Sequence, residues 1–412
     1  MAAEFEKVAA SAAALRDGCG IEIPGQTVDR VYTPSSIEAL SELVRAAAAD
    51  DVSLLVMGGQ TRLHWAKPTT KIACAVSLAG LSGIDEFEPD EGVLHAAAGT
   101  PLHVIREAVA AEGWELPLDA AGANTTVGGV IASAATGPRG LLFGPVKDAI
   151  LGLEVVGGDG VATKCGGRVV KNVTGYDMAK LYCGSFGSLA IVTGAWLRLR
   201  PAPSERRTLR AVGRADDETF AAIRKGARPI AARALCWEER SEEHAGATHA
   251  DVVIELGGSA AGVAHDTARL REVLPFEEVA DETVDSIREQ RAAREYPVMI
   301  RARVLGSRLG EMRNTVIDAG LSVSSDLGMG SIHGFGALSD ATALLGLRAR
   351  AESCGGYAVF ESLPEAWRDE VDVFGAHDGT ESIVETLASR FDPAGILNPG
   401  RFVRPVSKGR NA

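Results

Sequence analysis

The chain has 412 residues, 46% of them hydrophobic, and a formal net charge of −13 at pH 7. This length supports two or three domains with folded cores, and the acidic balance argues against a nucleic-acid partner, whose groove needs clustered Lys and Arg. The first ten residues, MAAEFEKVAA, contain acidic side chains and no apolar stretch, so we expect no signal peptide and a cytoplasmic protein.

Six cysteines are spread along the chain, and none forms a CxxC pair or a zinc-ribbon spacing. They are Cys19, Cys74, Cys165, Cys183, Cys236 and Cys354. Widely spaced thiols are typical of a reducing compartment. We therefore predict no metal site and no iron–sulfur cluster held by this chain alone.

The first half alternates strands and helices. The run Pro34-Ser35-Ser36 is predicted to cap a helix that runs to Asp50. A short buried strand over 54–57 follows and ends at the turn GGQT, residues 58–61. After another strand, over 93–98, Thr100 is the expected N-cap and Pro101 the first residue of a helix.

Two signals mark the end of this half. The segments LGLEVV and VATKC flank the turn GGDG, residues 157–160, and predict a hairpin. The run RPAP, residues 200–203, followed by charged residues, indicates a domain boundary.

The second half mixes strands and helices in a way that favours an antiparallel α+β sheet covered by helices on one face. Strands are predicted near residues 231–237, 251–256, 298–304 and 357–361, and helices near 266–273, 282–294, 309–319, 341–352 and 381–390.

The segment from Ala120 to Gly137 is the most informative, because 14 of its 18 residues are Gly, Ala, Ser or Thr. A backbone with so little side chain can press its amides against a large ligand. A tightly packed core turn would use the same residues, so both interpretations stay open. Asn124 within the segment, and Pro117, Asp119, Pro138 and Arg139 beside it, exclude a membrane span.

Two phosphate-binding motifs are missing from the sequence. No GxGxxG opens a helix after a strand, and no GxxxxGK[ST] occurs. An anionic ligand would therefore be held by backbone amides, at the turn over 58–62 and along the small-residue segment.

An ordered series of motifs carries a family resemblance. It consists of GGQT (58–61), TVGG (126–129), KNVTGYDM (171–178), GSFGSLAIVT (184–193) and DPAGILNPGRF (392–402). Together these motifs resemble the vanillyl-alcohol-oxidase-type family of FAD-binding proteins, and within it the FAD-binding subunits of bacterial glycolate oxidases.

The resemblance implies an α+β fold in which a two-subdomain PCMH-type FAD-binding domain is joined to a smaller α+β cap domain with an antiparallel sheet. The implied boundaries are 1–203 for the FAD domain, 204–390 for the cap, and 391–412 for a segment returning to the FAD domain. The implied cofactor contacts are Gly58, Gly59, Gln60, Thr61, Pro117, Gly122, Thr126, Gly128, Gly129, Ser133, Gly137, Ile191 and Val192.

We expect the FAD to be noncovalent, because His64 does not match the Gly-Gly-His pattern of relatives that tether flavin. His333, in GMGSIHGFG, is the candidate base for oxidising a small 2-hydroxy acid. A structural histidine is the alternative. For Lys171, Tyr176 and Asp177 we favour an ordered turn in which Asp177 caps a helix and Tyr176 packs its ring.

The resemblance further implies an FAD-dependent oxidoreductase that passes electrons to partner subunits, namely a second flavoprotein and an iron–sulfur protein. Those partners could bring the chain to the inner membrane without a span of its own. Two alternatives stay open, a noncatalytic assembly subunit of the same complex and an independent FAD-linked alcohol oxidoreductase.

Overall fold

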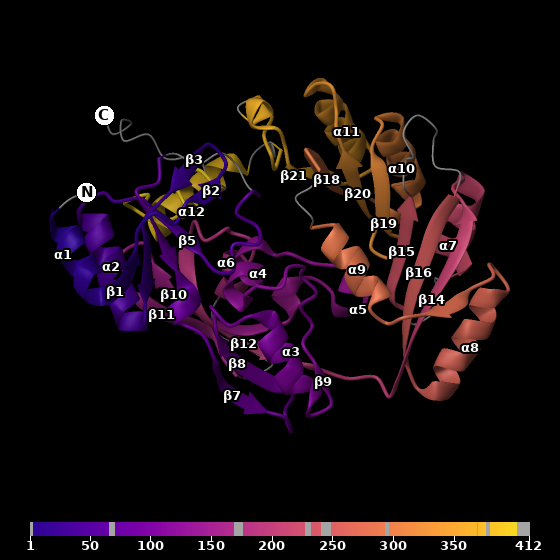
Figure 1. Cartoon of the computed structure of the whole chain (residues 1–412), viewed down its shortest axis with the longest axis horizontal. Helices are drawn as coiled ribbons and strands as arrows, with labels where there is room; N and C mark the ends of the chain where they lie inside the picture. The colour runs from indigo at the N-terminus through magenta and orange to yellow at the C-terminus, as the bar shows by residue number, and fades with distance from the viewer. Residues whose placement is uncertain are drawn as a thin grey trace. The chain divides into compact units, whose positions relative to one another are not determined.

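The computed structural model describes residues 3–65, 71–168, 176–226, 232–239, 249–292, 296–368, 370–375 and 380–401. Figure 1 shows the course of the chain. It divides into two compact units: unit 1 comprises Met1–Ala135, Pro145–Ala202 and Ala376–Ala412, and unit 2 comprises Thr136–Gly144 and Pro203–Gly375. Compared with the expected boundaries, residues 136–144 group with unit 2, and the return to unit 1 comes at 376 instead of 391.

Unit 1 begins with a four-stranded sheet in the order β1-β4-β6-β5, in which β6 pairs in parallel with both β4 and β5. The bounds are β1 (Ala13–Arg16), β4 (Val31–Pro34), β5 (Leu54–Met57) and β6 (Cys74–Ser77), with α1 (Ala3–Ala12), α2 (Ile37–Ala49) and the hairpin β2 (Ile21–Ile23) and β3 (Gln26–Val28). Ser36 caps α2 as predicted, because its side chain accepts a hydrogen bond from the amide of Ala39. The helix then buries Leu40, Leu43 and Val44.

A second, antiparallel sheet in unit 1 has the order β11-β10-β12-β8-β7. Its strands are β7 (Ile84–Glu88), β8 (Val93–Ala97), β10 (Ile150–Gly157), β11 (Ala162–Gly166) and β12 (Ala190–Arg198), so the predicted hairpin is confirmed. The other elements are α3 (Leu102–Ala110), α4 (Val127–Ser133), α6 (Met178–Tyr182), α12 (Glu381–Phe391), β9 (Trp114–Glu115), β13 (Arg200–Pro201), η1 (Leu78–Gly80) and η2 (Val146–Asp148).

Two local predictions in unit 1 were wrong. Pro101, and not Thr100, is the N-cap of α3, because the Thr100 hydroxyl instead donates to the carbonyls of Ala97 and Gly83. Tyr176 is 92% exposed and does not pack its ring. Asp177 does cap α6, whereas Lys171 lies outside the described residues.

Unit 2 is built on one eight-stranded antiparallel sheet in the order β17-β14-β16-β15-β19-β20-β18-β21. The strands are β14 (Glu205–Arg214), β15 (Ala232–Glu239), β16 (His249–Gly258), β17 (Glu277–Val279), β18 (Val298–Arg303), β19 (Ser322–Asp326), β20 (Ser331–Gly336) and β21 (Tyr357–Ser362). The helices are α5 (Gly140–Phe143), α7 (Asp217–Gly226), α8 (Ala260–Arg271), α9 (Thr283–Gln290), α10 (Leu309–Asp318) and α11 (Thr342–Ser353), with η3 (Gly306–Arg308) and η4 (Glu365–Trp367).

The two faces of this sheet differ in chemistry. One face joins α7, α8, α10 and α11 in a large apolar core that includes Trp237, Ile254 and Ile332. Because side chains alternate along a strand, the neighbouring residues face the other way, where α9 packs over Cys236 and Val253. Helices therefore lie on both faces, and the expectation of helices on one face alone was wrong. We call the face under α9 the polar face, because the charged side chains described below gather on it.

Candidate functional site

A pocket in unit 1 brings together five stretches of the chain that lie far apart in the sequence. Half of its lining residues are Gly, Ala or Ser, so a ligand there can contact main-chain atoms directly. The lining residues are Val56, Met57, Gly58, Leu78, Gly128, Gly129, Ala132, Ser185, Phe186, Gly187, Ala190, Ile191, Val192 and Asn398.

The glycine turn after β5 packs directly on the small-residue segment. A Cβ added to Gly59 would lie 1.6 Å from the carbonyl oxygen of Asn124, and one added to Gly58 would lie 2.3 Å from Thr126 Oγ1. The hydroxyls of Thr61 and Thr125 are 3.0 Å apart. Both glycines are therefore required by close packing between the two segments that the sequence assigned to one cofactor.

Helix α4 forms the second wall of the pocket. Thr126 is its N-cap and accepts a hydrogen bond from the Gly129 amide, and the Ser133 hydroxyl donates to the Gly129 carbonyl at 2.7 Å. A Cβ at Gly128 would lie 2.8 Å from that of Ala98, so only glycine lets α4 approach β8 this closely.

The C-terminal segment completes the pocket, and its residues were not among those predicted. Asn398 Oδ1 accepts from the Val56 amide at 2.8 Å, and its Nδ2 donates to the Phe186 carbonyl at 2.7 Å. The amide of Leu54 donates to the Ile396 carbonyl, and that of Asn398 donates back to Leu54. The motif NPGRF was the available signal for this contact, but no short-range pattern says what it touches.

Of the predicted cofactor contacts, Gly58, Gly128, Gly129, Ile191 and Val192 line the pocket. The remainder in unit 1 lie outside the lining: Gly59, Gln60, Thr61, Pro117, Gly122, Thr126 and Ser133. Gly137 belongs to unit 2.

The residues of this site fit FAD. The pocket offers a backbone wall at Gly58, Gly128 and Gly129, and apolar side chains from Val56, Ile191 and Val192. Glycines let a ligand lie close to the main chain, and an apolar wall suits a flat aromatic ring.

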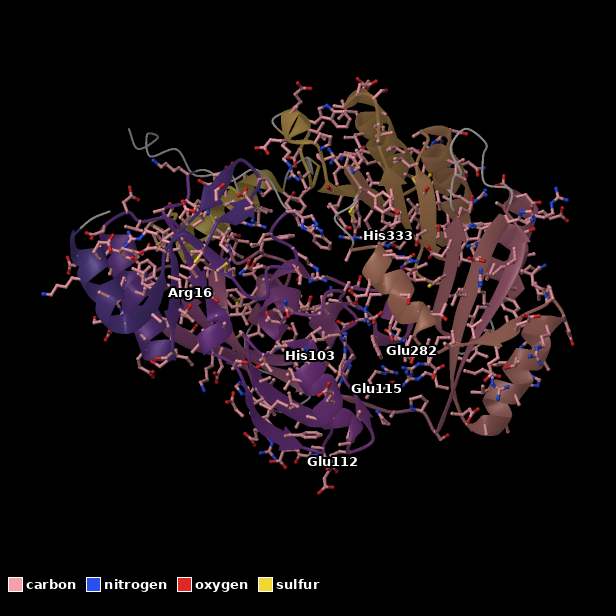
Figure 2. The ribbon with its side chains drawn as sticks, viewed as in Figure 1. Arg16, His103, Glu112, Glu115, Glu282 and His333 are labelled. Carbon is pink, nitrogen blue, oxygen red and sulfur yellow. The ribbon has the colours of Figure 1, made fainter. Side chains whose placement is uncertain are left out.

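The polar face of unit 2 carries the second candidate, His333, labelled in Figure 2. It lies on β20, is 9% exposed, and its ring stacks on that of Phe335. Nε2 lies 3.5 Å from Ser331 Oγ and 3.8 Å from Asp326 Oδ2. Nδ1 has no hydrogen-bond partner among the described residues.

Electrostatics keep this imidazole neutral. Burial lowers the pKa of His333 below its ordinary value, although Asp326 acts in the opposite direction. Burial alone would raise the pKa of Asp326, but the charge of Arg291 outweighs it and lowers that pKa to about 2. A neutral ring at pH 7 is able to accept a proton.

Arg291 joins polar residues of two strands, β15 and β19. It donates to Asp326 Oδ1 at 2.7 Å, to Ser324 Oγ at 2.5 Å and to Glu238 Oε1 at 3.0 Å. These three residues lie 33 to 53 positions from Arg291 in the sequence. No short sequence motif could therefore predict that they cluster around it.

The described residues contain no group of three or more His, Cys, Asp or Glu placed to hold a metal ion. None of the six cysteines, all of which are described, forms a disulfide. None of the helices in the described part of the chain has the length and apolarity that a membrane crossing requires.

Comparisons with known proteins agree with the geometry of unit 1. Residues 28–166 match a protein family described as an FAD binding domain. The glycolate oxidase subunit GlcE of Escherichia coli (strain K12) is 27% identical over 378 residues, which cover 89% of this chain and 97% of that protein.

Other relatives match a smaller part of the chain. A D-2-hydroxyglutarate dehydrogenase of Xanthomonas citri pv. viticola is 34% identical over 42% of this chain, and a D-lactate dehydrogenase of Archaeoglobus fulgidus is 32% identical over 42%. These matches span only 37% and 38% of the dehydrogenases' own lengths.

The fold has a counterpart among solved structures. An alkyldihydroxyacetonephosphate synthase superposes with a TM-score of 0.65 over 91% of this chain and 78% of its own, at 14% identity. That similarity shows that the two proteins share a fold of mixed helices and sheets. Residues 28–166 therefore carry the match to an FAD binding domain, and this match together with the glycolate oxidase relative supports FAD as the cofactor of the chain.

Proposed function

We propose that the chain is the FAD-binding subunit of a multisubunit enzyme that oxidises a small 2-hydroxy acid of the glycolate type. The pocket in unit 1, walled by Gly58, Gly128 and Gly129 within the part that matches the FAD domain, carries this proposal. Similarity to a glycolate oxidase subunit over almost the whole of both chains supports the substrate class.

FAD, bound noncovalently, supplies the acceptor for the hydride that leaves C2 of the substrate. Within this chain, Gly58, Gly128, Gly129, Ile191 and Val192 would hold the cofactor. His333 would accept the proton of the substrate hydroxyl, since burial lowers its pKa and leaves the ring neutral.

The partners we propose are a second flavoprotein subunit and an iron–sulfur subunit that carries the electrons onward. This part of the proposal rests on the subunit nature of the glycolate oxidase relative. A cytoplasmic location, with attachment to the inner membrane only through these partners, follows from it.

The direct test is a variant that narrows the pocket. Ala132 lies on α4 and lines the pocket. Ala132→Leu therefore adds three carbon atoms to the side chain at the place where the cofactor would bind. We expect the purified wild-type chain to show flavin absorption that moves to the supernatant after acid precipitation, and A132L to bind FAD at least tenfold more weakly. Ala261→Leu, at an exposed site of α8, is the matched control and should bind normally.

Two results would oppose the proposal. A folded wild-type chain that binds no FAD would contradict the cofactor and favour a noncatalytic assembly subunit. Flavin that is bleached by glycolate in the isolated chain, and reoxidised without partners, would instead favour an independent oxidoreductase.

A further inference from the structure

Phe186 is unusual in both its side chain and its backbone conformation. It is half-buried and is the only aromatic residue in the lining of the unit 1 pocket, as the described residues define it. Its φ is 53°, in the left-handed region that a bulky residue rarely adopts. Of the five non-glycine residues with positive φ in the described part of the chain, it is the only one with a large apolar side chain.

The main chain of Phe186 is fixed from two sides. Its amide donates to the carbonyl of Ala132 on α4 at 2.8 Å, and its carbonyl accepts from Nδ2 of Asn398 at 2.7 Å. Strained backbone persists only where the surrounding contacts fix it, and such residues cluster at ligand sites. Glycine would make the same turn without steric strain, so the turn alone does not account for a phenylalanine here.

The rest of the lining shows which chemistry would use an aromatic side chain. The lining includes the apolar residues Val56, Ile191 and Val192, and no charged residue is among its described members. An apolar pocket with one aromatic side chain favours a planar ring, which gains ring stacking in addition to burial. Both ends of FAD, the adenine and the isoalloxazine, are planar rings.

Resting on the proposed function, we propose that Phe186 is a binding residue that stacks on a planar ring of FAD and determines the preference of the pocket for an aromatic ligand. The strained backbone keeps the phenyl ring at the pocket. A glycine at the same position would relieve the backbone but lose this contact.

Titration of the flavin-free full chain with FAD tests the role of the ring. Phe186→Leu keeps an apolar side chain and Phe186→Tyr keeps the ring, and both leave a bulky residue in the left-handed backbone. We expect F186L to raise the Kd for FAD about threefold to tenfold and F186Y to change it less than twofold. Phe87→Leu, at a half-buried position of β7 outside the lining, is the matched control and should bind like the wild type. Should F186L not fold, Phe186→Met takes its place in the same comparison.

Thermal unfolding without FAD tests the strain independently of binding. Phe186→Gly and Phe186→Ala both remove the ring, but only glycine adopts the left-handed backbone without steric strain. We expect F186G to unfold at least about 2 °C above F186A, although both should bind FAD no more tightly than F186L. Ala134→Gly relieves another positive φ, of 49°, outside the lining and should leave the FAD affinity unchanged.

Titrations with ADP and with FMN identify the ring that Phe186 contacts. A Kd that rises in F186L for ADP but not for FMN would place the adenine against Phe186. A rise for FMN but not for ADP would place the isoalloxazine there, and the absorption band of bound flavin should then shift as well. Either result supports ring stacking by Phe186.

Different outcomes overturn the inference and the proposed function. An F186L chain that binds FAD as tightly as the wild type, or an F186Y chain that binds it as weakly as F186L, would overturn the role of the ring. Equal unfolding temperatures of F186G and F186A would overturn the strain at this position. A folded wild-type chain that binds no FAD would instead remove the proposed function itself.

Discussion

At the scale of single residues, Arg139 explains how residues 136–144 are held in unit 2. Its guanidinium lies 2.7 Å from Glu255 Oε2 and 2.6 Å from Asp285 Oδ1. Glu255 forms a second ion pair, in which its Oε1 lies 2.6 Å from Nε of Arg233. Glu255 is fully buried. Arg139 is itself 7% exposed, so these are buried ion pairs and not surface ones.

This cluster predicts a pH-dependent stability. Burial alone would raise the pKa of Glu255, but Arg139 and Arg233 hold it below its usual value. The stabilisation is therefore fully present above the ordinary pKa of Glu and is lost as the pH falls through the lowered one. We expect Glu255→Gln to lower the free energy of unfolding by about 3 kcal/mol at pH 7, since it leaves two buried guanidinium groups underpaired.

Urea unfolding of both proteins at several pH values measures this difference, which should shrink below about pH 4, as the Glu carboxylate of the wild type becomes protonated. Glu352→Gln, at an exposed position of α11, should stay within about 0.5 kcal/mol of the wild type. A difference that stays constant down to pH 3 would show that the loss comes from packing and not from charge.

At the scale of elements, Asn398 is the connection that joins β5, the turn at Phe186 and the C-terminal segment. It is 3% exposed and has a positive φ of 44°. Asn398→Ala removes both side-chain hydrogen bonds and puts a less tolerant residue in that conformation, whereas Asn398→Gly removes the bonds but relieves the backbone. Hydrogen bonds lost at buried groups cost about 1–3 kcal/mol each.

We therefore expect N398A to be destabilised more than N398G in thermal unfolding, and both to bind FAD more weakly than the wild type because Asn398 lines the pocket. Ser382→Ala, at the start of α12, provides a control in the same C-terminal region. Equal stability of all four proteins would contradict a structural role for Asn398.

The elements also show what local patterns can predict. The strand β5 and the helix α2 were found because a cap, an apolar stripe and a glycine turn lie next to one another in sequence. The strands β14 and β19 were not predicted from the sequence, because charged and polar residues are typical of a domain boundary or a loop. In β19, Ser324 and Asp326 are polar because they contact Arg291 on the polar face.

The residues of the candidate site also differ in whether the local sequence pattern reveals them. Glycines that permit close packing, such as Gly58 and Gly128, leave a local signature that the sequence shows. Asn398, 342 residues from its partner Val56, and Arg291, 35 residues from Asp326, leave none. Their contacts arise only when the sheets bring distant segments together, so composition and spacing could not reveal them.

At the scale of the whole molecule, the two units have separate apolar cores. The core of unit 1 contains Leu40, Leu94 and Val130, and that of unit 2 contains Trp237, Ile300 and Phe360. All residues that line the pocket belong to unit 1. A ligand that binds only the folded state stabilises the part that forms its site, by about 2.7 kcal/mol at a hundredfold excess over Kd.

Hydrogen exchange measured with and without FAD tests this division directly. We expect FAD to slow exchange of the amides in β5, α4 and β12, whose residues line the pocket, and to leave β14 and β16 in unit 2 nearly unchanged. The physical reason is that local opening must release the cofactor in the first set and not in the second. The A132L variant should lose this protection at the same FAD concentration. Equal slowing in both units would mean that cofactor binding and the unfolding of unit 2 are one cooperative event, and the assignment of the cofactor to unit 1 alone would then fail.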